Sequence, residues 1–194
     1  MADRMAARIF IGGKIPEILV EPLCDQIDAS SASIEYGDPP LRPQTAQDLL
    51  DVREQRNKND SNCPSLLVLY DDEASWGEFQ ELEEFLREHE IAYTRHSDGK
   101  YEHDPCIVEY RPGHDLVELA ANKSMEPVVP AGEVQKALDK LDEAIKHDHH
   151  GRTGAAEAVM MKARRMLRKL LPPELPPLES FEIDSIKNKE PESG

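Results

Sequence analysis

Ser65-Leu66-Leu67-Val68-Leu69-Tyr70 is the strongest strand signal in the sequence and decides its fold class. Pro64 and Asp71 bound this apolar run. A continuous apolar run is typical of a strand covered on both faces, because neither face can then be left in water. We therefore expect residues 65–70 to form the central strand of a sheet, with helices packed against it.

The segments on the N-terminal side of this run predict strands that alternate with helices. Residues 8–13 are a short apolar stretch that ends in two glycines, which suits a strand and a tight turn. Apolar residues then recur at helical spacing over residues 15–29. Residues 33–37 are a second candidate strand, and Thr45 is a good N-cap for a helix that ends near Gln55.

The C-terminal side predicts a helix, a meander of strands and two more helices. Ser75 or Asp72 is the expected cap of a helix whose apolar residues fall three and four positions apart. Turn-forming residues separate the segments after it, which predicts antiparallel pairing. These segments are strands at 91–95, 106–110 and 116–119, and amphipathic helices at 131–147 and 155–171.

This order of elements predicts an α/β fold with an α+β tendency, in which helices flank a mixed sheet. A glycine-containing hinge at residues 151–154 precedes the last helix, and a proline-rich stretch follows it. We therefore expect an acidic α/β domain at residues 1–150 and a basic amphipathic helix at 151–171. Residues 172–194 are expected to be a flexible, disordered acidic tail.

Acidic residues outnumber basic residues 39 to 23, and the excess lies in one part of the chain. Residues 1–150 hold 32 acidic and 15 basic residues, whereas residues 152–171 hold six basic residues and one acidic residue. Such an acidic body repels the phosphates of nucleic acids and anionic lipids. We therefore expect no direct nucleic-acid binding by the body, and a basic or nucleic-acid-binding protein as its partner.

The cysteines and the N-terminus indicate the cellular compartment. Cys24, Cys63 and Cys106 are far apart and show no CxxC spacing, which argues against a zinc knuckle or a disulfide framework. Free thiols suit a reducing compartment, so we expect a cytoplasmic location. The N-terminal residues lack the apolar stretch of a signal peptide, and no apolar run is long enough for a membrane span.

Three consecutive carboxylates, Asp71, Asp72 and Glu73, follow the predicted central strand directly. Open α/β sheets bind ligands at the carboxyl ends of their strands, and carboxylate oxygens are suitable ligands for Mg²⁺. Glu35 and Asp38 would add oxygens if their strand is a neighbour. The alternative is that Asp71 and Asp72 form a turn and cap the next helix, which is the commoner role of acidic residues there.

A second set of residues resembles the Rossmann-like nucleotide N-glycosidases. That family opens with a short strand and a glycine turn, to which Gly12-Gly13 correspond, and it keeps a catalytic glutamate in a later helix. Ser75-Trp76-Gly77 followed by Glu78 or Glu81 match this second feature. The resemblance implies cleavage of a nucleotide glycosidic bond. The alternative is that the two glycines only make a tight turn.

Histidines and the single tryptophan are further candidates for binding. Residues 147–150 contain three histidines, and His96 and His103 face each other across a predicted hairpin. Neither set has a full complement of metal ligands at a known spacing, and a solvated helix end is the commoner explanation of the first. Trp76 is expected in a loop beside the acidic cluster, where it is either a hot spot for a partner or packed over the sheet edge.

The basic helix is a candidate recognition element. Its apolar face includes Met160 and Leu171, and Arg164, Arg165 and Arg168 are among the basic residues around it. This pattern suits a helix that lies in a groove, on an anionic membrane or on an acidic surface. Docking on its own acidic domain, or in a homodimer, is the alternative to recognition of a separate partner.

Two functions therefore remain open. The first is a non-enzymatic regulatory protein that needs no cofactor and binds a basic protein through its acidic body and basic helix. The second is a small enzyme, in which Asp71, Asp72 and Glu73 bind Mg²⁺ or activate water and Glu78 or Glu81 is the base. The enzyme lacks an evident set of basic residues for phosphate, because Lys14, Arg95 and Lys100 are the only candidates.

Overall fold

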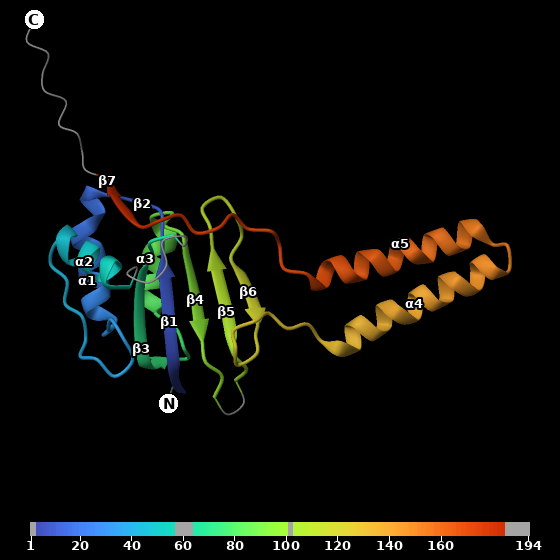
Figure 1. The fold of residues 1–194 in the computed structure, drawn as a ribbon, viewed down its shortest axis with the longest axis horizontal. Coiled ribbons are helices and arrows are strands. Elements are labelled where there is room, and N and C mark those ends of the chain that lie inside the picture. Colours follow the sequence, from blue (N-terminus) through green and yellow to red (C-terminus); the bar gives the residue numbers. More distant parts are fainter. Residues whose placement is uncertain (1–2, 57–63, 101–102, 185–194) are drawn as a thin grey trace, which may run out of the picture. The chain divides into compact units, whose positions relative to one another are not determined.

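The computed structural model describes residues 3–56, 64–100 and 103–184 (Figure 1). The chain divides into two compact units: unit 1 is Met1–Met125 with Leu175–Gly194, and unit 2 is Glu126–Glu174. The sequence predicts a boundary at residue 150, whereas contacts group the helix before that residue with the helix after it. No helix in the described ranges is long and apolar enough to cross a membrane.

Unit 1 is a mixed α/β fold built on a five-stranded sheet in which all neighbouring strands are antiparallel. The strand order is β3-β1-β4-β5-β6. Its strands are β1 (Arg4–Ile11), β3 (Leu67–Ser75), β4 (Tyr93–Ser97), β5 (Cys106–Tyr110) and β6 (Val117–Ala120). Parallel pairing joins β2 (Lys14–Pro16) to β7 (Glu182–Asp184) in a second, small sheet. The predicted α/β class is confirmed.

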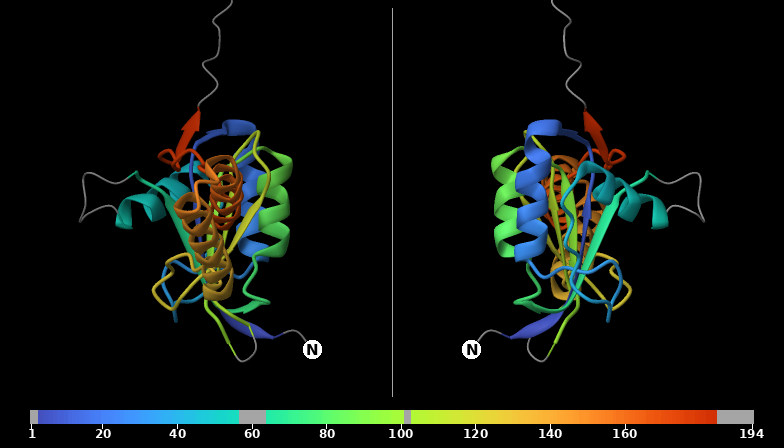
Figure 2. Two further views of the ribbon diagram at one scale, coloured as in Figure 1. Left: turned by 90° about the vertical axis from the view of Figure 1, so that its right-hand side faces the viewer. Right: turned by 90° about the vertical axis from the view of Figure 1, so that its left-hand side faces the viewer.

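Helices cover one face of the large sheet (Figure 2). A short 3-10 helix, η1 (Glu17–Leu19), leads into α1 (Val20–Ala29), which packs beside α3 (Gln80–Glu88), while α2 (Ala46–Arg56) packs against β3. Alternation along β1 turns Ala7, Ile9 and Ile11 toward this core, where they are fully buried. Aliphatic and aromatic side chains of the three helices fill the same layer, and their burial is the main source of stability.

The sequence predicts β3 as the central strand, and the structure corrects this by placing it at the edge of the sheet. Its outer side is covered by other means. Ser33 exchanges two backbone hydrogen bonds with Tyr70, with N–O distances of 2.7 and 3.0 Å, and α2 packs against the strand. The four residues from Leu67 to Tyr70 are therefore buried although their strand has one sheet neighbour. Residues 33–37 form this single bridge and not the predicted strand.

The other predicted elements are confirmed with small shifts, apart from one helix cap. Tyr93 pairs with Tyr110 across the expected hairpin, and β6 completes the meander. The Thr45 hydroxyl accepts a hydrogen bond from the Asp48 N–H at 3.2 Å, as expected of an N-cap. The cap predicted for α3 at Asp72 or Ser75 is wrong, because β3 continues through both residues. The N-cap of α3 is Phe79, which makes no side-chain capping bond.

Residues 175–184 lie along unit 1 and form a strap, which corrects the prediction of a disordered tail for this segment. Phe181 is fully buried in the core, and its N–H donates to the Ser65 carbonyl at 2.7 Å. Gly13 donates its N–H to the Glu179 carbonyl at 3.1 Å and accepts from the Glu182 N–H at 3.0 Å. One buried aromatic side chain and one strand pairing thus anchor an acidic, proline-rich sequence. Residues 185–194 of the predicted tail lie outside the described residues.

Unit 2 is an antiparallel hairpin of two helices, α4 (Ala131–His149) and α5 (Thr153–Leu170), and both predicted helices are confirmed. The hinge expected at residues 151–154 is shorter in the structure, where Gly151 adopts a positive φ of 68° and α5 begins at Thr153. The buried residues of the hairpin are four alanines: Ala137, Ala144, Ala156 and Ala163.

The face of the large sheet opposite the helices carries a partly buried histidine, His96. The Arg8 guanidinium donates to His96 Nδ1 at 3.3 Å from Nε, and the His96 ring packs edge-on against Phe10 with 5.1 Å between centroids. Burial, and then the charge of Arg8, lowers the pKa of His96 to about 4. The folded protein therefore keeps this imidazole neutral at pH values where the unfolded chain protonates it.

We predict that shortening the strap side chain Phe181→Ala destabilises unit 1 by about 3 to 5 kcal/mol, because the substitution leaves a cavity in the core. Urea unfolding followed by fluorescence of Trp76, the single tryptophan, measures the change in unit 1. Leu171→Ala is the control, since its exposed side chain should change stability by less than about 0.5 kcal/mol. Equal stabilities for the two variants would show that the strap is not part of the core.

A second prediction concerns pH. The unfolded chain binds a proton at His96 near pH 6.5 and the folded chain only near pH 4, so stability falls as the pH decreases from about 6.5 toward 4. His96→Gln should lose less stability than the unsubstituted protein between pH 6.5 and 5, measured by urea unfolding at each pH. His114→Gln, at an exposed position, is the control and should keep the original pH dependence. A steeper loss in His96→Gln would contradict this account.

Candidate functional site

A hollow of about 470 Å³ lies beside Trp76 in unit 1, and we call it the Trp76 pocket. Trp76 is 48% exposed, so its indole is available at the rim to a ligand that enters. The lining residues come from β1, the loop after β3, β4, the β4–β5 turn, β5 and β6. They are Met5, Trp76, Glu78, Arg95, Ser97, His103, Asp104, Pro105, Cys106, Glu118 and Ala120.

Strand register explains why the hollow forms here. Arg95 pairs with Val108 across β4 and β5, and Glu118 of β6 pairs with Val108 in turn. Paired residues project from the same face, and Arg95 reaches α3, so this is the helix-covered face. In the described part of the chain, β5 and β6 make their main contacts with neighbouring strands and not with a helix. Their side chains on this face therefore border open space beside α3.

A second hollow, of about 420 Å³, continues the Trp76 pocket along α3. The two hollows share Glu78, Arg95 and Glu118 as lining residues, and the second one extends to Arg87 and the half-exposed Leu116. Together they form a groove between α3 and the β5–β6 strands. A groove made of two joined hollows suits a polypeptide segment better than a small, enclosed ligand.

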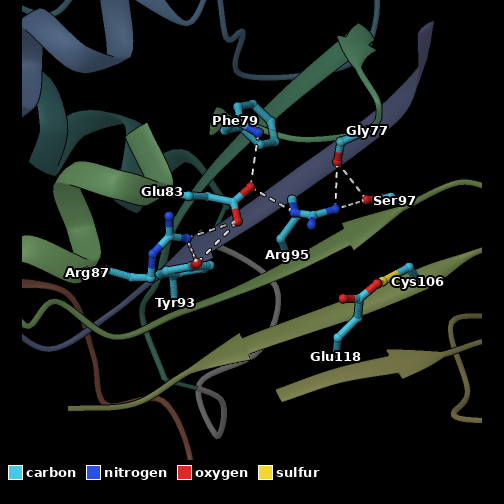
Figure 3. Close-up of polar contacts among 9 residues, drawn as sticks. All are labelled: Gly77, Phe79, Glu83, Arg87, Tyr93, Arg95, Ser97, Cys106 and Glu118. Carbon is cyan, nitrogen blue, oxygen red and sulfur yellow. Dashed lines mark hydrogen bonds and ion pairs between the residues drawn. The ribbon is translucent and has the colours of Figure 1, made fainter. Parts of the chain in front are cut away.

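A buried ion pair positions the rim of the pocket (Figure 3). Glu83 is 4% exposed and Arg95 is 6% exposed, and Arg95 Nε lies 2.8 Å from Glu83 Oε1. The same carboxylate oxygen accepts the Phe79 N–H at 3.0 Å, and Oε2 accepts the Tyr93 hydroxyl at 3.2 Å. Arg87 donates to Tyr93 Oη at 2.9 Å. Hydrogen bonds thus satisfy both oxygens of a charge that burial alone would strongly destabilise.

The same arginine fixes the turn that carries Trp76. Arg95 Nη1 donates to the Gly77 carbonyl at 2.7 Å and to the Ser97 hydroxyl, which itself donates to that carbonyl at 2.6 Å. Gly77 has a φ of 68°, and a Cβ there would lie 2.8 Å from Ser97 Cβ and 2.9 Å from Met5 Cγ. Only glycine therefore fits the position. Trp76 also adopts a left-handed conformation, with a φ of 60°, which costs a non-glycine residue about 1 to 2 kcal/mol.

Cys106 lies inside the Trp76 pocket but is not activated as a nucleophile. Its Sγ is 3.5 Å from Glu118 Oε1. Burial, and then the negative charge of Glu118, raises the pKa of Cys106 to about 11, so the group is a thiol at neutral pH. Burial also raises the pKa of Cys24 to about 11. The third cysteine, Cys63, lies outside the described residues.

The structure does not bring Asp71, Asp72 and Glu73 together as a metal site. They follow one another within β3, at the point where its register against β1 shifts between Asp71 and Ala74. Asp71 Oδ1 accepts the Glu73 N–H at 2.8 Å, and Asp72 Oδ2 accepts the Gly37 N–H at 2.7 Å. Burial raises the pKa of Asp71. Within residues 3–56, 64–100 and 103–184, no group of three or more His, Cys, Asp or Glu side chains is placed to hold a metal ion, the histidine candidates included.

The features that resemble a nucleotide N-glycosidase have other roles here. The Gly12 N–H donates to the Ala92 carbonyl and the Gly13 N–H to the Glu179 carbonyl, both at 3.1 Å, so the strap and not a phosphate occupies this turn. The large sheet is antiparallel, unlike a Rossmann sheet. Of the two candidate glutamates, Glu78 lines the Trp76 pocket, whereas Glu81 is exposed on α3.

Exposed carboxylates cover the two neighbouring helices α1 and α3, and we call this surface the acidic helix face. Its members are Glu21, Asp25, Asp28, Glu81, Glu84 and Glu88. Among the described residues, one ion pair reaches this set, between Arg42 and Asp28 at 3.5 Å. Glu21 and Asp25, and likewise Glu84 and Glu88, are four residues apart on one helix, where like charges repel by a few tenths of a kcal/mol. A basic partner would relieve that repulsion.

The predicted partner-binding residues fall in both units. Trp76 belongs to unit 1, whereas Met160, Arg164, Arg165, Arg168 and Leu171 are exposed residues of unit 2. The pair Glu83 and Arg95 could not be predicted from the sequence, because a glutamate on a charged helix is indistinguishable from its exposed neighbours without the fold. The available signal was Arg95 itself, a charged residue at the end of a segment predicted as a strand.

No family model, curated protein or solved structure that was compared with this chain matches it.

We predict that Glu83→Gln and Arg95→Met each destabilise unit 1 by about 3 to 5 kcal/mol, because each breaks the buried ion pair. After Arg95→Met, Glu83 keeps only Arg87, whose Nη1 lies 3.9 Å from Glu83 Oε2, as an ion-pair partner among the described residues. The double variant should lose less than the sum of the two, and urea unfolding followed by Trp76 fluorescence measures all three. Glu84→Gln is the matched control, since Glu84 is the exposed neighbour on the same helix and should change stability by less than about 0.5 kcal/mol. Additive losses would refute the coupling.

Proposed function

We propose that this protein is a non-enzymatic interaction protein whose acidic unit 1 binds a basic protein, with a lysine or arginine of the partner seated in the Trp76 pocket. The observation that carries the proposal is a half-exposed tryptophan at the rim of a hollow lined by three carboxylates, Glu78, Asp104 and Glu118. An aromatic face and carboxylates together are the features that recognise a cationic side chain.

The charges inside the pocket favour a cation. Arg95 is the one arginine or lysine among its lining residues, and the carboxylate of Glu83 pairs with it. The carboxylates of Glu78, Asp104 and Glu118 therefore leave the hollow net negative. Met5 and Cys106 offer apolar contact to the aliphatic stem of a lysine or arginine, while its charged end meets Trp76 and the carboxylates.

The charge of the whole unit supports attraction at longer range. Unit 1 contains 31 acidic and 14 basic residues, and the acidic helix face concentrates exposed carboxylates on neighbouring helices. Such a field accelerates encounter with a basic protein and is screened by salt. The groove beside α3 gives this attraction a defined contact, because it continues the Trp76 pocket along one flank of the helix.

We do not propose the enzymatic alternative as a second function. Its suggested metal ligands, Asp71, Asp72 and Glu73, belong to no group among the described residues that could hold a metal ion, and Lys100, one of the three residues suggested for phosphate, donates instead to the Arg4 carbonyl at 2.7 Å.

The proposal predicts that an oligo-arginine peptide binds the full chain and changes the fluorescence of Trp76. Trp76→Ala should weaken binding by about tenfold or more, as expected for a central aromatic contact, measured by fluorescence anisotropy of a labelled peptide. Raising the salt concentration from 50 to 300 mM should weaken binding by both proteins.

Two controls separate pocket binding from general charge attraction. Glu84→Gln removes one charge from the acidic helix face without touching the pocket, whereas Glu118→Gln removes one from the lining. Glu118→Gln should weaken peptide binding more than Glu84→Gln does. Equal effects of these two variants, together with unchanged binding by Trp76→Ala, would reject the pocket as the site. An absence of peptide binding at low salt would reject the proposed function itself.

A further inference from the structure

Unit 2, taken by itself, buries only small side chains. Ala137 and Ala144 of α4 meet Ala156 and Ala163 of α5, and each pair is seven residues apart along its helix. Alanine contacts allow the two helices to approach closely, but they bury little apolar area. The large apolar residues of both helices lie outside this contact line, so the hairpin has not completed its own core.

Most of these larger residues lie on one side of the hairpin. Leu138 and Ile145 follow the contact alanines of α4 by one residue, and Met160 and Leu167 stand three residues before and four after Ala163 on α5. At about 100° per residue, both sets are displaced in the same rotational sense from the alanine line. Because the two helices are antiparallel, residues displaced in the same rotational sense from the alanine line lie on the same side of the hairpin. Val134 and Leu141 extend this apolar hairpin face.

The apolar hairpin face is open in the structure. Leu138, Ile145 and Met160 are 46%, 54% and 51% exposed. The opposite side of the hairpin is mostly polar, although Val159 and Met166 also lie there, partly buried. On that side Lys140 is bonded to Glu143, whose lowered pKa reflects that bond first and the charge of Lys162 on α5 among smaller causes. The hairpin is therefore amphipathic as a unit, with one polar side and one apolar side.

Charges next to the apolar hairpin face differ between the two helices. On α4 the exposed residues beyond its edge include Asp139, Asp142 and Lys146, and on α5 they include Glu157, Arg164 and Arg168, so the α4 edge is net acidic and the α5 edge net basic. A second copy of the same face complements this pattern when α4 of one chain lies over α5 of the other. The twofold axis then runs along the hairpin, and every helix has antiparallel neighbours, as in a four-helix bundle.

We propose that unit 2 is a dimerisation module, in which the apolar hairpin faces of two chains pack together as an antiparallel four-helix bundle. The bundle covers the leucine, isoleucine and methionine side chains that each hairpin leaves open. The acidic edge of each α4 lies against the basic edge of the other α5, and this charge pairing selects a second copy of the chain as the occupant of the face.

Adjacent methionines provide a matched test. Met160 lies on the apolar hairpin face, whereas Met161 is 53% exposed and points away from it by helical spacing. In analytical ultracentrifugation of the full chain at tens of micromolar, the unsubstituted protein and Met161→Glu should be dimers. Met160→Glu should shift to monomer, with its dimer dissociation constant raised by at least about tenfold. Helix content from circular dichroism checks that each variant is folded.

A charge exchange tests the arrangement of the helices. Asp139→Arg with Asp142→Arg makes both edges basic, and Arg164→Asp with Arg168→Asp makes both edges acidic. Each doubly substituted protein alone should dimerise on the order of tenfold more weakly, because like charges then meet. Mixing the two proteins should restore dimers, since each acidic edge then faces a basic one.

Three results would overturn the proposal. An unsubstituted chain that is monomeric at 100 µM would mean that the face is covered within one chain or by a different protein. Equal monomerisation by Met160→Glu and Met161→Glu would remove the assigned face. Failure of the mixed charge variants to associate more tightly than either alone would reject the α4-over-α5 packing. None of these outcomes depends on binding of a basic peptide, so failure here is distinguishable from failure of the proposed function.

Discussion

The buried ion pair of Glu83 and Arg95 is the interaction on which the candidate site depends. It joins α3 to β4, and through Arg95 it reaches the carbonyl of Gly77, so that one guanidinium fixes a helix, a strand and the turn between β3 and α3. A buried charge pair is rarely a large net source of stability, because desolvation offsets most of the attraction. Its value here is positional: it holds Trp76 in a left-handed conformation at the rim of a hollow. An apolar pair in its place would fill the space without directing that turn.

Buried and exposed charges are arranged differently in unit 1. Inside unit 1, charges are matched: Glu83 with Arg95, and Arg111 with backbone carbonyls of Tyr93 and Pro176 at 2.7 and 2.8 Å. Outside, on α1 and α3, carboxylates repeat along the helices with few basic neighbours. Folding therefore uses its few buried cations to build the core and leaves the excess acid on the surface. Repulsion within that excess lowers stability, and a cationic partner is the agent that would remove the penalty.

Local sequence patterns are sufficient to predict the helices and strands, but they do not predict which of these elements lie next to one another. The spacing of apolar residues, the N-cap at Thr45 and the turn-forming residues predict the helix after Thr45, the meander and both helices of unit 2. Each of these elements depends on residues close in sequence. The position of β3 depends on Ser33 and α2, which cover its outer side, and no local pattern reports such a cover. Phe181 is a similar case, because its acidic, proline-rich surroundings predict disorder while one pairing with β2 and one buried ring hold it. Glu83 is hidden for the same reason: burial distinguishes it from Glu84, and burial is a tertiary property.

The strap gives the two proposals a common consequence. The chain leaves unit 1 after Met125 and rejoins it at Leu175, and residues 179–182 are bonded on both sides of Gly13. Unit 2 is therefore an insertion that is tethered to unit 1 at both of its ends, and a bundle formed by two copies of unit 2 carries two copies of unit 1 with it. If both proposals hold, two Trp76 pockets on one assembly would bind a partner with repeated basic segments by avidity, since the second contact is made at a high effective concentration. Because each contact is weakened by salt, the combined binding depends on ionic strength more steeply than one contact does. Dimerisation thus supplies what a single exposed acidic surface lacks, a preference for partners with more than one basic segment.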